Sequence, residues 1–228
     1  MTHDDDHIDP SAADPALHRH VYETLRQRLV TGVIRPDETF STRGLASELS
    51  VSQMPIREAL NRLAAEGAIE IRAKRRLAIP AMTASRFEDL LSCRLLLEPA
   101  AGAAAVGRID EARMKQLRVI DARMDRALAD GDVFTYMQSN HAFHFTIYEA
   151  SERPTILRLI ETLWLQFGPF MRVVYGRYGT SNLVDQHQRA LKAAAAHDPE
   201  EMANALHDDI ADGMGLIGRN IFEQTNVA

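Results

Sequence analysis

The chain has 228 residues, 46% of them hydrophobic, and a formal net charge of −6 at pH 7. This length is enough to bury more than one core. The acidic balance excludes a protein that coats nucleic acid along its whole surface. The charge is nevertheless uneven, because residues 15–80 carry eleven Lys or Arg against seven Asp or Glu, while residues 81–228 carry fifteen against twenty. One basic segment in an acidic chain is typical of a protein with a single DNA-binding module.

The start of the chain and its cysteine content bear on where the protein works. Residues 1–14 contain five Asp and no base, and their lack of apolar periodicity predicts a disordered acidic tail. Cys93 is the only cysteine, which excludes an intrachain disulfide. We find no signal peptide and no apolar run long enough to span a membrane, so the sequence predicts a cytoplasmic protein.

Two short helices are predicted at the start of the basic segment. The first covers residues 18–31, where apolar residues recur at helical spacing, and Gly32 ends it. The second covers residues 43–49, with Ser41 or Thr42 as its cap. The turn that follows the second helix is tight, so a third helix is expected to pack closely against it.

The third helix has Ser52 as its N-cap and Pro55 in its first turn. Ile56, Leu60 and Leu63 repeat at helical spacing and are expected to face the core. Polar and cationic residues gather on the opposite side near the N-terminus, which is the part of a recognition helix that meets bases in the DNA major groove. An ordinary amphipathic surface helix is the alternative for this segment alone. The candidate DNA-contacting residues here are Ser52, Gln53, Met54, Arg57 and Asn61, joined by Arg43 of the preceding helix.

A cationic hairpin is predicted after the third helix. Two short apolar segments, residues 68–71 and 77–80, flank a tip of five residues that includes four cations. This pattern favours a β-hairpin, or wing. Lys74, Arg75 and Arg76 suit a phosphate backbone or a minor groove, with a solvated charge cluster as the alternative. With the helices before it, the hairpin predicts a winged helix-turn-helix.

Residues 17–82 resemble the N-terminal winged-helix domain of GntR-type bacterial transcription regulators. The matching stretches are Gly32-Val33-Ile34-Arg35-Pro36, Arg43-Gly44-Leu45-Ala46, residues 51–60 and Leu63-Ala64-Ala65-Glu66-Gly67. The resemblance places Arg43 and Arg57 on positions that the family uses at DNA. Gln53 stands where an arginine that reads guanine is common, and because glutamine prefers adenine, the operator is expected to differ at that step. Leu77 stands where the wing usually has glycine.

The remainder, residues 83–228, is predicted to be helical, with six or seven helices. Breaks are expected at residues 107–110, 130–132, 151–154, 168–169, 176–181 and 197–199. The predicted fold class is therefore mainly α. An N-terminal winged helix-turn-helix with a small β-hairpin wing, residues 15–82, precedes an all-α helical bundle that binds an effector and dimerises.

Within the helical remainder, Arg94-Leu95-Leu96-Leu97-Glu98-Pro99-Ala100 resembles the opening helix of the ligand-binding domain in the FadR-like branch of the family, the FCD type. Many members of that branch bind a divalent metal and a small carboxylate in this domain. The resemblance therefore implies a metal and a carboxylate effector here.

The spacing of residues along the predicted helices indicates which residues could bind the metal. Asn140 and His144 are i,i+4 neighbours on one helical face. If Asp198 centres the turn of the final helical hairpin, His187 and Asp209 lie eleven residues on either side of it and reach the same level. By resemblance, histidine is usual at the position of Asp209, and aspartate or asparagine at that of Asn140.

The predicted donor set contains two imidazoles and two oxygens, which suits Zn, Ni or Mn. A register error of one turn would replace Asp209 by His207. The competing interpretations are that His187 is a surface residue and that Asn140 makes a hydrogen bond between helices. His141, next to the set, is interpreted as structural.

An anionic effector would need cationic partners. Arg94 and Arg172 are the candidates for binding its carboxylate, and an ion pair between Arg94 and Glu98 is the alternative for the first. We therefore expect a DNA-binding transcription regulator, by resemblance a repressor, that binds a pseudo-palindromic operator as a homodimer and responds to the effector.

Two other function classes remain open on the sequence. A metal-dependent enzyme acting on small organic acids could carry the winged helix as an appendage, although no general base stands at a fixed spacing to the metal set. A protein-interaction adaptor would bind DNA insensitively to salt, or not at all, whereas a basic DNA reader shows a steep salt dependence.

Overall fold

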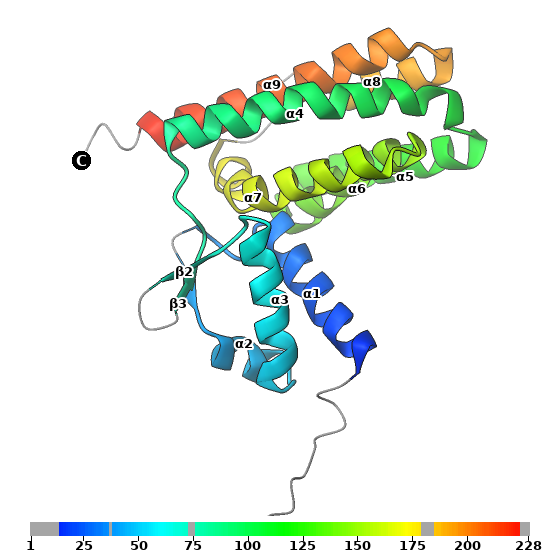
Figure 1. The fold of residues 1–228 in the computed structure, drawn as a ribbon. Helices are drawn as coiled ribbons and strands as arrows, with labels where there is room; N and C mark the ends of the chain where they lie inside the picture. Colours follow the sequence, from blue (N-terminus) through cyan, green and yellow to red (C-terminus); the bar gives the residue numbers. More distant parts are fainter. Residues whose placement is uncertain (1–13, 37, 73–75, 179–184, 224–228) are drawn as a thin grey trace, which may run out of the picture.

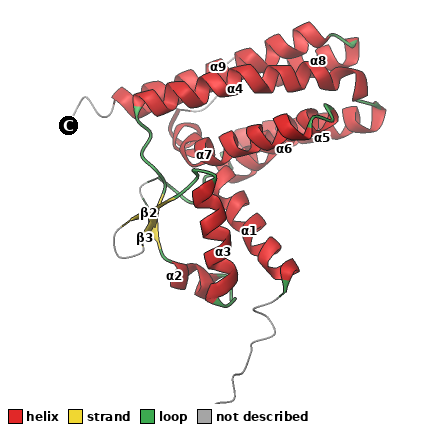
Figure 2. Ribbon diagram, viewed as in Figure 1, coloured by secondary structure: helices red, strands yellow, loops and turns green. Residues whose placement is uncertain are grey.

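The computed structural model describes residues 14–36, 38–72, 76–178 and 185–223, and for residues 172–178, 216, 219–221 and 223 it describes the backbone only. The predicted acidic tail lies outside this range except for Asp14. Helices dominate the described residues, as predicted, and one small sheet accompanies them (Figure 2). The sheet and the first three helices form a smaller body below a larger helical body (Figure 1).

The first three helices begin where polar side chains can cap them. Helix α1 spans Pro15–Val30, and the Asp14 carboxylate accepts a hydrogen bond from the Ala16 N–H at 2.8 Å. Helix α2 spans Thr42–Glu48, and the Ser41 hydroxyl caps it by accepting from the Gly44 N–H at 3.1 Å. Helix α3 spans Gln53–Ala65, with Ser52 at the N-cap position.

The core of the smaller body lies between α1 and α3. Leu25, Leu29, Ile56 and Leu63 are fully buried there, at the helical spacing that the sequence predicted. Each such side chain contributes about 1.5–3 kcal/mol relative to leaving it in water. This packing leaves the opposite face of α3 free to meet solvent or DNA.

The wing is one edge of a three-stranded antiparallel sheet. Strands β2 (Glu70–Arg72) and β3 (Arg76–Ala78) form the predicted hairpin, with Ile71 opposite Leu77. Strand β1 (Thr39–Phe40) pairs with the other side of β3, so the strand order is β1-β3-β2. Sequence reasoning missed β1 because two residues are too few to show an alternating pattern.

Six α-helices and one 3₁₀ turn make up the helical body within the described residues. They are α4 (Ala84–Ala105), η3 (Val106–Arg108), α5 (Glu111–Asp130), α6 (Val133–Ala150), α7 (Pro154–Tyr178), α8 (Gln186–Ala196) and α9 (Pro199–Glu223). Helices α4, α8 and α9 form one layer and α5, α6 and α7 the other (Figure 1). The largest buried side chains between the layers include Tyr148 and Trp164.

The predicted break at Gly168-Pro169 is wrong, because α7 runs through it. Gly168 is where α7 crosses the end of α1. A Cβ at this position would lie 2.7 Å from Val30 Cα and 2.8 Å from the Leu29 carbonyl oxygen. The glycine therefore permits close approach of two helices, and helix packing overrides the breaker signal of the dipeptide.

The expectation of no membrane-length apolar run also needs correction. The segment Ala84–Arg108 contains an 18-residue window with a mean hydropathy of 1.3, so by length and composition it could cross a membrane. It contains the buried charges of Arg94 and Glu98, however, and packs against α9, α7 and α6. These contacts are those of a core helix in a bundle.

Candidate functional site

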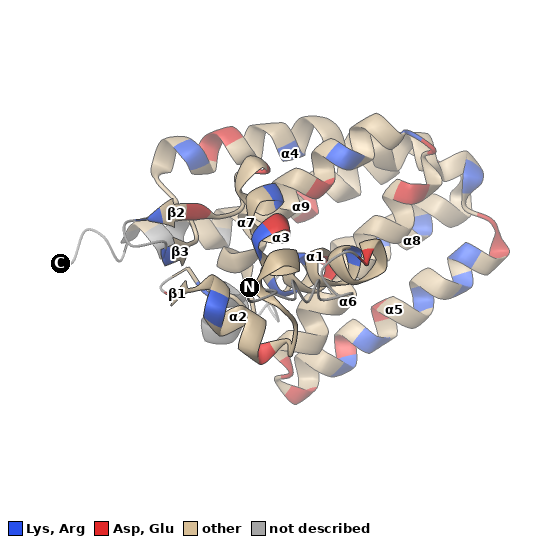
Figure 3. Cartoon of the chain, turned by 60° about the horizontal axis from the view of Figure 1, so that its bottom comes forward, with Lys and Arg blue, Asp and Glu red and all other residues tan. Residues whose placement is uncertain are grey.

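The exposed face of α3 carries the predicted recognition residues. Gln53, Met54, Arg57 and Asn61 are all exposed, and 52% of the Met54 surface is accessible. The N-terminal end of α3 lies beside α2, at the far end from the helical body (Figure 1). Figure 3 brings this end forward and shows Lys or Arg on α2, α3 and beside the wing strands. The arrangement presents a polar, cationic helix end to a partner.

The cations around this helix end are available to a partner. Arg43 on α2 and Arg57 on α3 are exposed, and neither has an ion-pair partner among the described residues. The Ser52 hydroxyl is buried and finds no hydrogen-bond partner in the part of the chain that the structure describes. Arg76 is exposed at the start of β3. Two further wing candidates, Lys74 and Arg75, lie outside the described residues.

Three of the predicted metal ligands meet inside the helical body. His144 of α6, His187 of α8 and Asp209 of α9 each offer a donor atom within 4.8 Å of the others. His144 Nε2 lies 3.2 Å from Asp209 Oδ2, and His187 Nε2 lies 3.6 Å from Asp209 Oδ1. Asn140, one turn before His144, lines a small cavity together with His144 and Asp209.

The electrostatics of this cluster fit a cation. His187 Nε2 is buried without a hydrogen-bond partner in the described residues, and burial lowers the pKa of His187 although Asp209 opposes the shift. Burial raises the pKa of Asp209, but the positive charge of His187 and the neighbouring His144 outweigh it and lower the value to about 2. A carboxylate facing imidazole nitrogens, one of them unpartnered, suits a borderline metal such as Zn, Ni or Mn.

Two other histidines lie apart from this donor set. The His207 side chain is 52% exposed and pairs with Asp208 Oδ1 at 3.3 Å, so it does not replace Asp209 in the cluster. His141 stacks on Phe145, with ring centroids 4.1 Å apart, and its buried Nε2 has no described hydrogen-bond partner. Burial lowers the pKa of His141 to about 3, aided by Arg26 and His144.

Arg94 is not arranged as the bidentate clamp that the sequence suggested. Its Nε and Nη2 donate to Glu98 at 2.5 and 3.2 Å, which is the alternative ion pair. Only Nη1 remains, at 3.5 Å from the weak acceptor Met214 Sδ. The cavity that it lines measures about 20 Å³, enough for an ion or one water molecule but too small for a carboxylate metabolite. The side chain of Arg172, the other candidate, lies outside the described residues.

The comparisons with known proteins agree with this architecture. Residues 17–79 match the model for "Bacterial regulatory proteins, gntR family", and residues 89–212, more than half of the chain, match the "FCD domain". The chain belongs to the GntR family of bacterial regulatory proteins. It is a DNA-binding transcription regulator with an FCD domain.

Relatives that match this GntR-family chain over most of its length are transcription regulators. "HTH-type transcriptional regulator McbR" of Escherichia coli is 25% identical over 89% of this chain and 93% of its own. The "Gluconate operon transcriptional repressor" of Bacillus subtilis is 28% identical over 85% of this chain and 83% of its own. The solved structure of E. coli McbR/YncC has a TM-score of 0.81 at 26% identity and covers 92% of this chain and 99% of that one. These relatives exclude the enzyme interpretation.

Sequence reasoning missed a hydrogen-bond hub behind the metal cluster. Glu98 accepts from the Tyr148 hydroxyl at 2.7 Å and the Trp164 Nε1–H at 3.1 Å, in addition to Arg94. Tyr148 in turn lies 3.0 Å from His144 Nδ1. The i,i+4 spacing of His144 and Tyr148 was a usable signal, whereas the position of Trp164 depends on tertiary packing.

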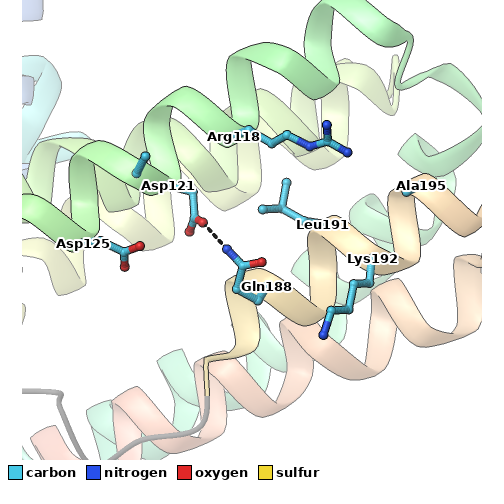
Figure 4. Close-up of a pocket in the computed structure, with 8 residues that line it drawn as sticks. Arg118, Asp121, Asp125, Gln188, Leu191, Lys192 and Ala195 are labelled. Atoms are coloured by element: carbon cyan, nitrogen blue, oxygen red, sulfur yellow. Dashed lines mark hydrogen bonds between the residues drawn. The ribbon is translucent and has the colours of Figure 1, made fainter.

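A second hollow of about 360 Å³ lies between α5 and α8 (Figure 4). Asp121 of α5 is buried there and accepts a hydrogen bond from Gln188 Nε2 at 2.5 Å. Burial, together with Asp125 and Asp185, raises the pKa of Asp121 to about 6. Donor atoms of Asp121, Asp185 and His187 lie within 4.8 Å of one another, so Asp121 of α5 and Asp185, the N-cap of α8, also approach His187.

Proposed function

We propose that this GntR-family chain is a repressor that binds a pseudo-palindromic operator as a homodimer, through residues 15–82, in the cytoplasm. The observation that carries the proposal is the exposed N-terminal end of α3, where Arg43 and Arg57 have no ion-pair partner among the described residues. The name of the Bacillus subtilis relative, a transcriptional repressor, supports the sign of regulation.

The proposed roles follow from side-chain chemistry. Gln53 and Asn61 can read adenine through bidentate hydrogen bonds, and Met54 can contact a thymine methyl group. Arg43, Arg57 and the wing cations Lys74, Arg75 and Arg76 supply phosphate contacts, which fix the register of the protein on the duplex. The Ser52 hydroxyl lies at the N-terminus of α3, where a phosphate is favoured.

Operator binding tests this proposal. The operator is recovered by selection from random DNA, and its binding by the Arg57→Ala variant is compared with its binding by Arg118→Ala. Arg118 is an exposed arginine of α5, so this control changes the net charge by the same amount. Arg57→Ala should weaken operator binding and reduce the slope of its salt dependence by about 1, as expected for a lost phosphate contact, and Arg118→Ala should bind like the parent. Equal binding by parent and Arg57→Ala, or no selected operator at all, would overturn it.

We further propose that residues 83–228 hold a divalent metal through Asn140, His144, His187 and Asp209. Three of these ligands converge within 4.8 Å and include a buried, unpartnered nitrogen. Metal content after loading with Zn, Ni or Mn and gel filtration should be one ion per chain in the parent and in His207→Ala. His144→Ala and His187→Ala should retain none.

A small carboxylate completing the metal's coordination is the proposed effector. Arg94 lines the cavity, and among the described residues its Nη1 has only the weak acceptor Met214 Sδ as a hydrogen-bond partner, so it can give a charge-assisted hydrogen bond to such an anion. The cavity of about 20 Å³ must enlarge to admit it. Identification by mass spectrometry of a carboxylate that co-purifies with the metal-loaded chain would support this step, and an unchanged thermal midpoint across a panel of small carboxylates would contradict it.

A further inference from the structure

We propose that Tyr148 and Glu98 fix the tautomer of His144, so that its Nε2 is the atom presented to the metal. The inference rests on the metal site of the proposed function and adds two residues outside the donor set. Both act through another side chain and are therefore positioning residues.

The Glu98 carboxylate is the acceptor at the end of a series of hydrogen bonds that begins at His144. Glu98 is fully buried at 0% exposure and forms an ion pair with Arg94 through both carboxylate oxygens. An ionised carboxylate only accepts hydrogen bonds. Every group that contacts Glu98 closely must therefore point a hydrogen at it.

Glu98 determines the orientation of the Tyr148 hydroxyl. The phenol has one hydrogen, which it donates to Glu98 Oε2 at 2.7 Å. A tyrosine phenol has an ordinary pKa of about 10, so it keeps its hydrogen at neutral pH. Its oxygen can then only accept from the nitrogen at 3.0 Å, which is His144 Nδ1.

The hydrogen bond to Tyr148 determines which nitrogen of His144 is free to bind a metal. With hydrogen on Nδ1, a neutral imidazole carries its lone pair on Nε2, and this atom lies 3.2 Å from Asp209 Oδ2. With no hydrogen on Nε2, these two acceptors face one another, and a metal cation bound between them would relieve their repulsion. Metal-ligating histidines typically donate their other N–H to a fixed partner, and loss of that partner weakens metal binding about 10–100-fold.

The Trp164 Nε1–H, which also donates to Glu98 Oε2, holds the same carboxylate from α7. The hub thus joins α4, α6 and α7 through one buried side chain. His144 and Tyr148 are four residues apart on α6, so a single helix positions the ligand and its partner. A rotation of the His144 ring would break this arrangement.

The test uses the full chain and zinc as the probe. Tyr148→Phe removes only the hydroxyl, and Tyr22→Phe is the matched control because the Tyr22 phenol also donates to a carboxylate, Glu66, but in the winged-helix body. Zinc affinity, measured by competition with a chromophoric chelator, should fall about 10–100-fold in Tyr148→Phe and stay at the parent value in Tyr22→Phe. Parent-like zinc affinity in Tyr148→Phe would overturn the inference while leaving the metal site intact.

Nitrogen NMR of the histidine side chains gives a second readout, which is made on the parent chain. His144→Ala identifies the resonances, and parent His144 should carry hydrogen on Nδ1 both with zinc and without it. Hydrogen on Nε2, with zinc on Nδ1, would overturn the inference. If the parent binds no zinc, the metal site of the proposed function fails, and the spectrum of the metal-free chain still decides the tautomer.

Discussion

Arg86 and Gln166 hold the C-terminal end of α3 against α7. Arg86 Nη2 donates to Gln166 Oε1 at 3.1 Å and to the Gly67 carbonyl oxygen at 3.1 Å. Gln166 Nε2 donates to the Glu66 carbonyl oxygen at 3.1 Å. Two residues before Gln166, Trp164 lines the cavity beside His144 and Asp209. Helix α7 therefore contacts both this cavity and the C-terminal end of α3, the proposed recognition helix, and physically connects them.

Removing the Gln166 side chain should weaken this connection. Gln166→Ala leaves the Glu66 carbonyl and one Arg86 N–H without their partner, at a cost of roughly 1–3 kcal/mol in the free energy of unfolding. We also expect zinc loading to change operator affinity through this connection, and Gln166→Ala should reduce that change, measured as the ratio of dissociation constants with and without zinc. Gln138→Ala, which loses a surface hydrogen bond to Arg123, is the control. A parent-like ratio in Gln166→Ala would show that coupling takes another route.

A methyl group at Gly168 should push the two bodies apart. In Gly168→Ala the new Cβ would sit 2.7 Å from the Val30 backbone, which cannot yield as a flexible side chain does. Overpacking of this kind costs about 1–3 kcal/mol. Gly107→Ala is the matched control, because a Cβ there meets nothing within 4 Å. Denaturant unfolding of both variants checks the prediction, and equal midpoints would refute it.

These contacts mark the limit of what the sequence predicts. Helix α3 follows from local rules, since its cap position and the spacing of Ile56, Leu60 and Leu63 depend on residues close in the chain. The meeting of His187 and Asp209 was also predictable, because a short turn fixes the register of two antiparallel helices.

The missed features depend on partners far apart in the chain. Arg86 and Gln166 are separated by 80 positions, and neither belongs to a motif. The sequence indicates Glu98 only as the partner of Arg94, whereas Tyr148 and Trp164 also contact it from two other helices. Periodicity reports which face of a helix is buried, but it does not report which buried polar groups meet.

The raised pKa of Asp121 predicts a pH-dependent effect on stability. Burial together with Asp125 and Asp185 raises it from 3.8 to about 6, so the ionised carboxylate destabilises the folded state. This contribution favours folding below pH 4 and is lost as the pH rises through 6. Asp121→Asn should therefore be more stable than the metal-free parent at pH 7, and the difference should shrink toward pH 4. Urea unfolding at both pH values checks the sign, and an Asn variant less stable at pH 7 contradicts it.

The buried pair of Arg94 and Glu98 should be costly to break from one side. Arg94→Met leaves the carboxylate of Glu98 in the core with only neutral donors, and such loss of one partner costs on the order of 3–5 kcal/mol. Adding Glu98→Gln removes the stranded charge and should recover much of that loss. Arg108→Met is the control, because Arg108 pairs with Glu152 at the surface, where both side chains are at least half exposed, and exposed pairs contribute about 0–1 kcal/mol. Chemical denaturation of the three variants measures the comparison. If Arg94→Met and Arg108→Met lost equal stability, the Glu98 carboxylate would not depend on Arg94 for its charge balance.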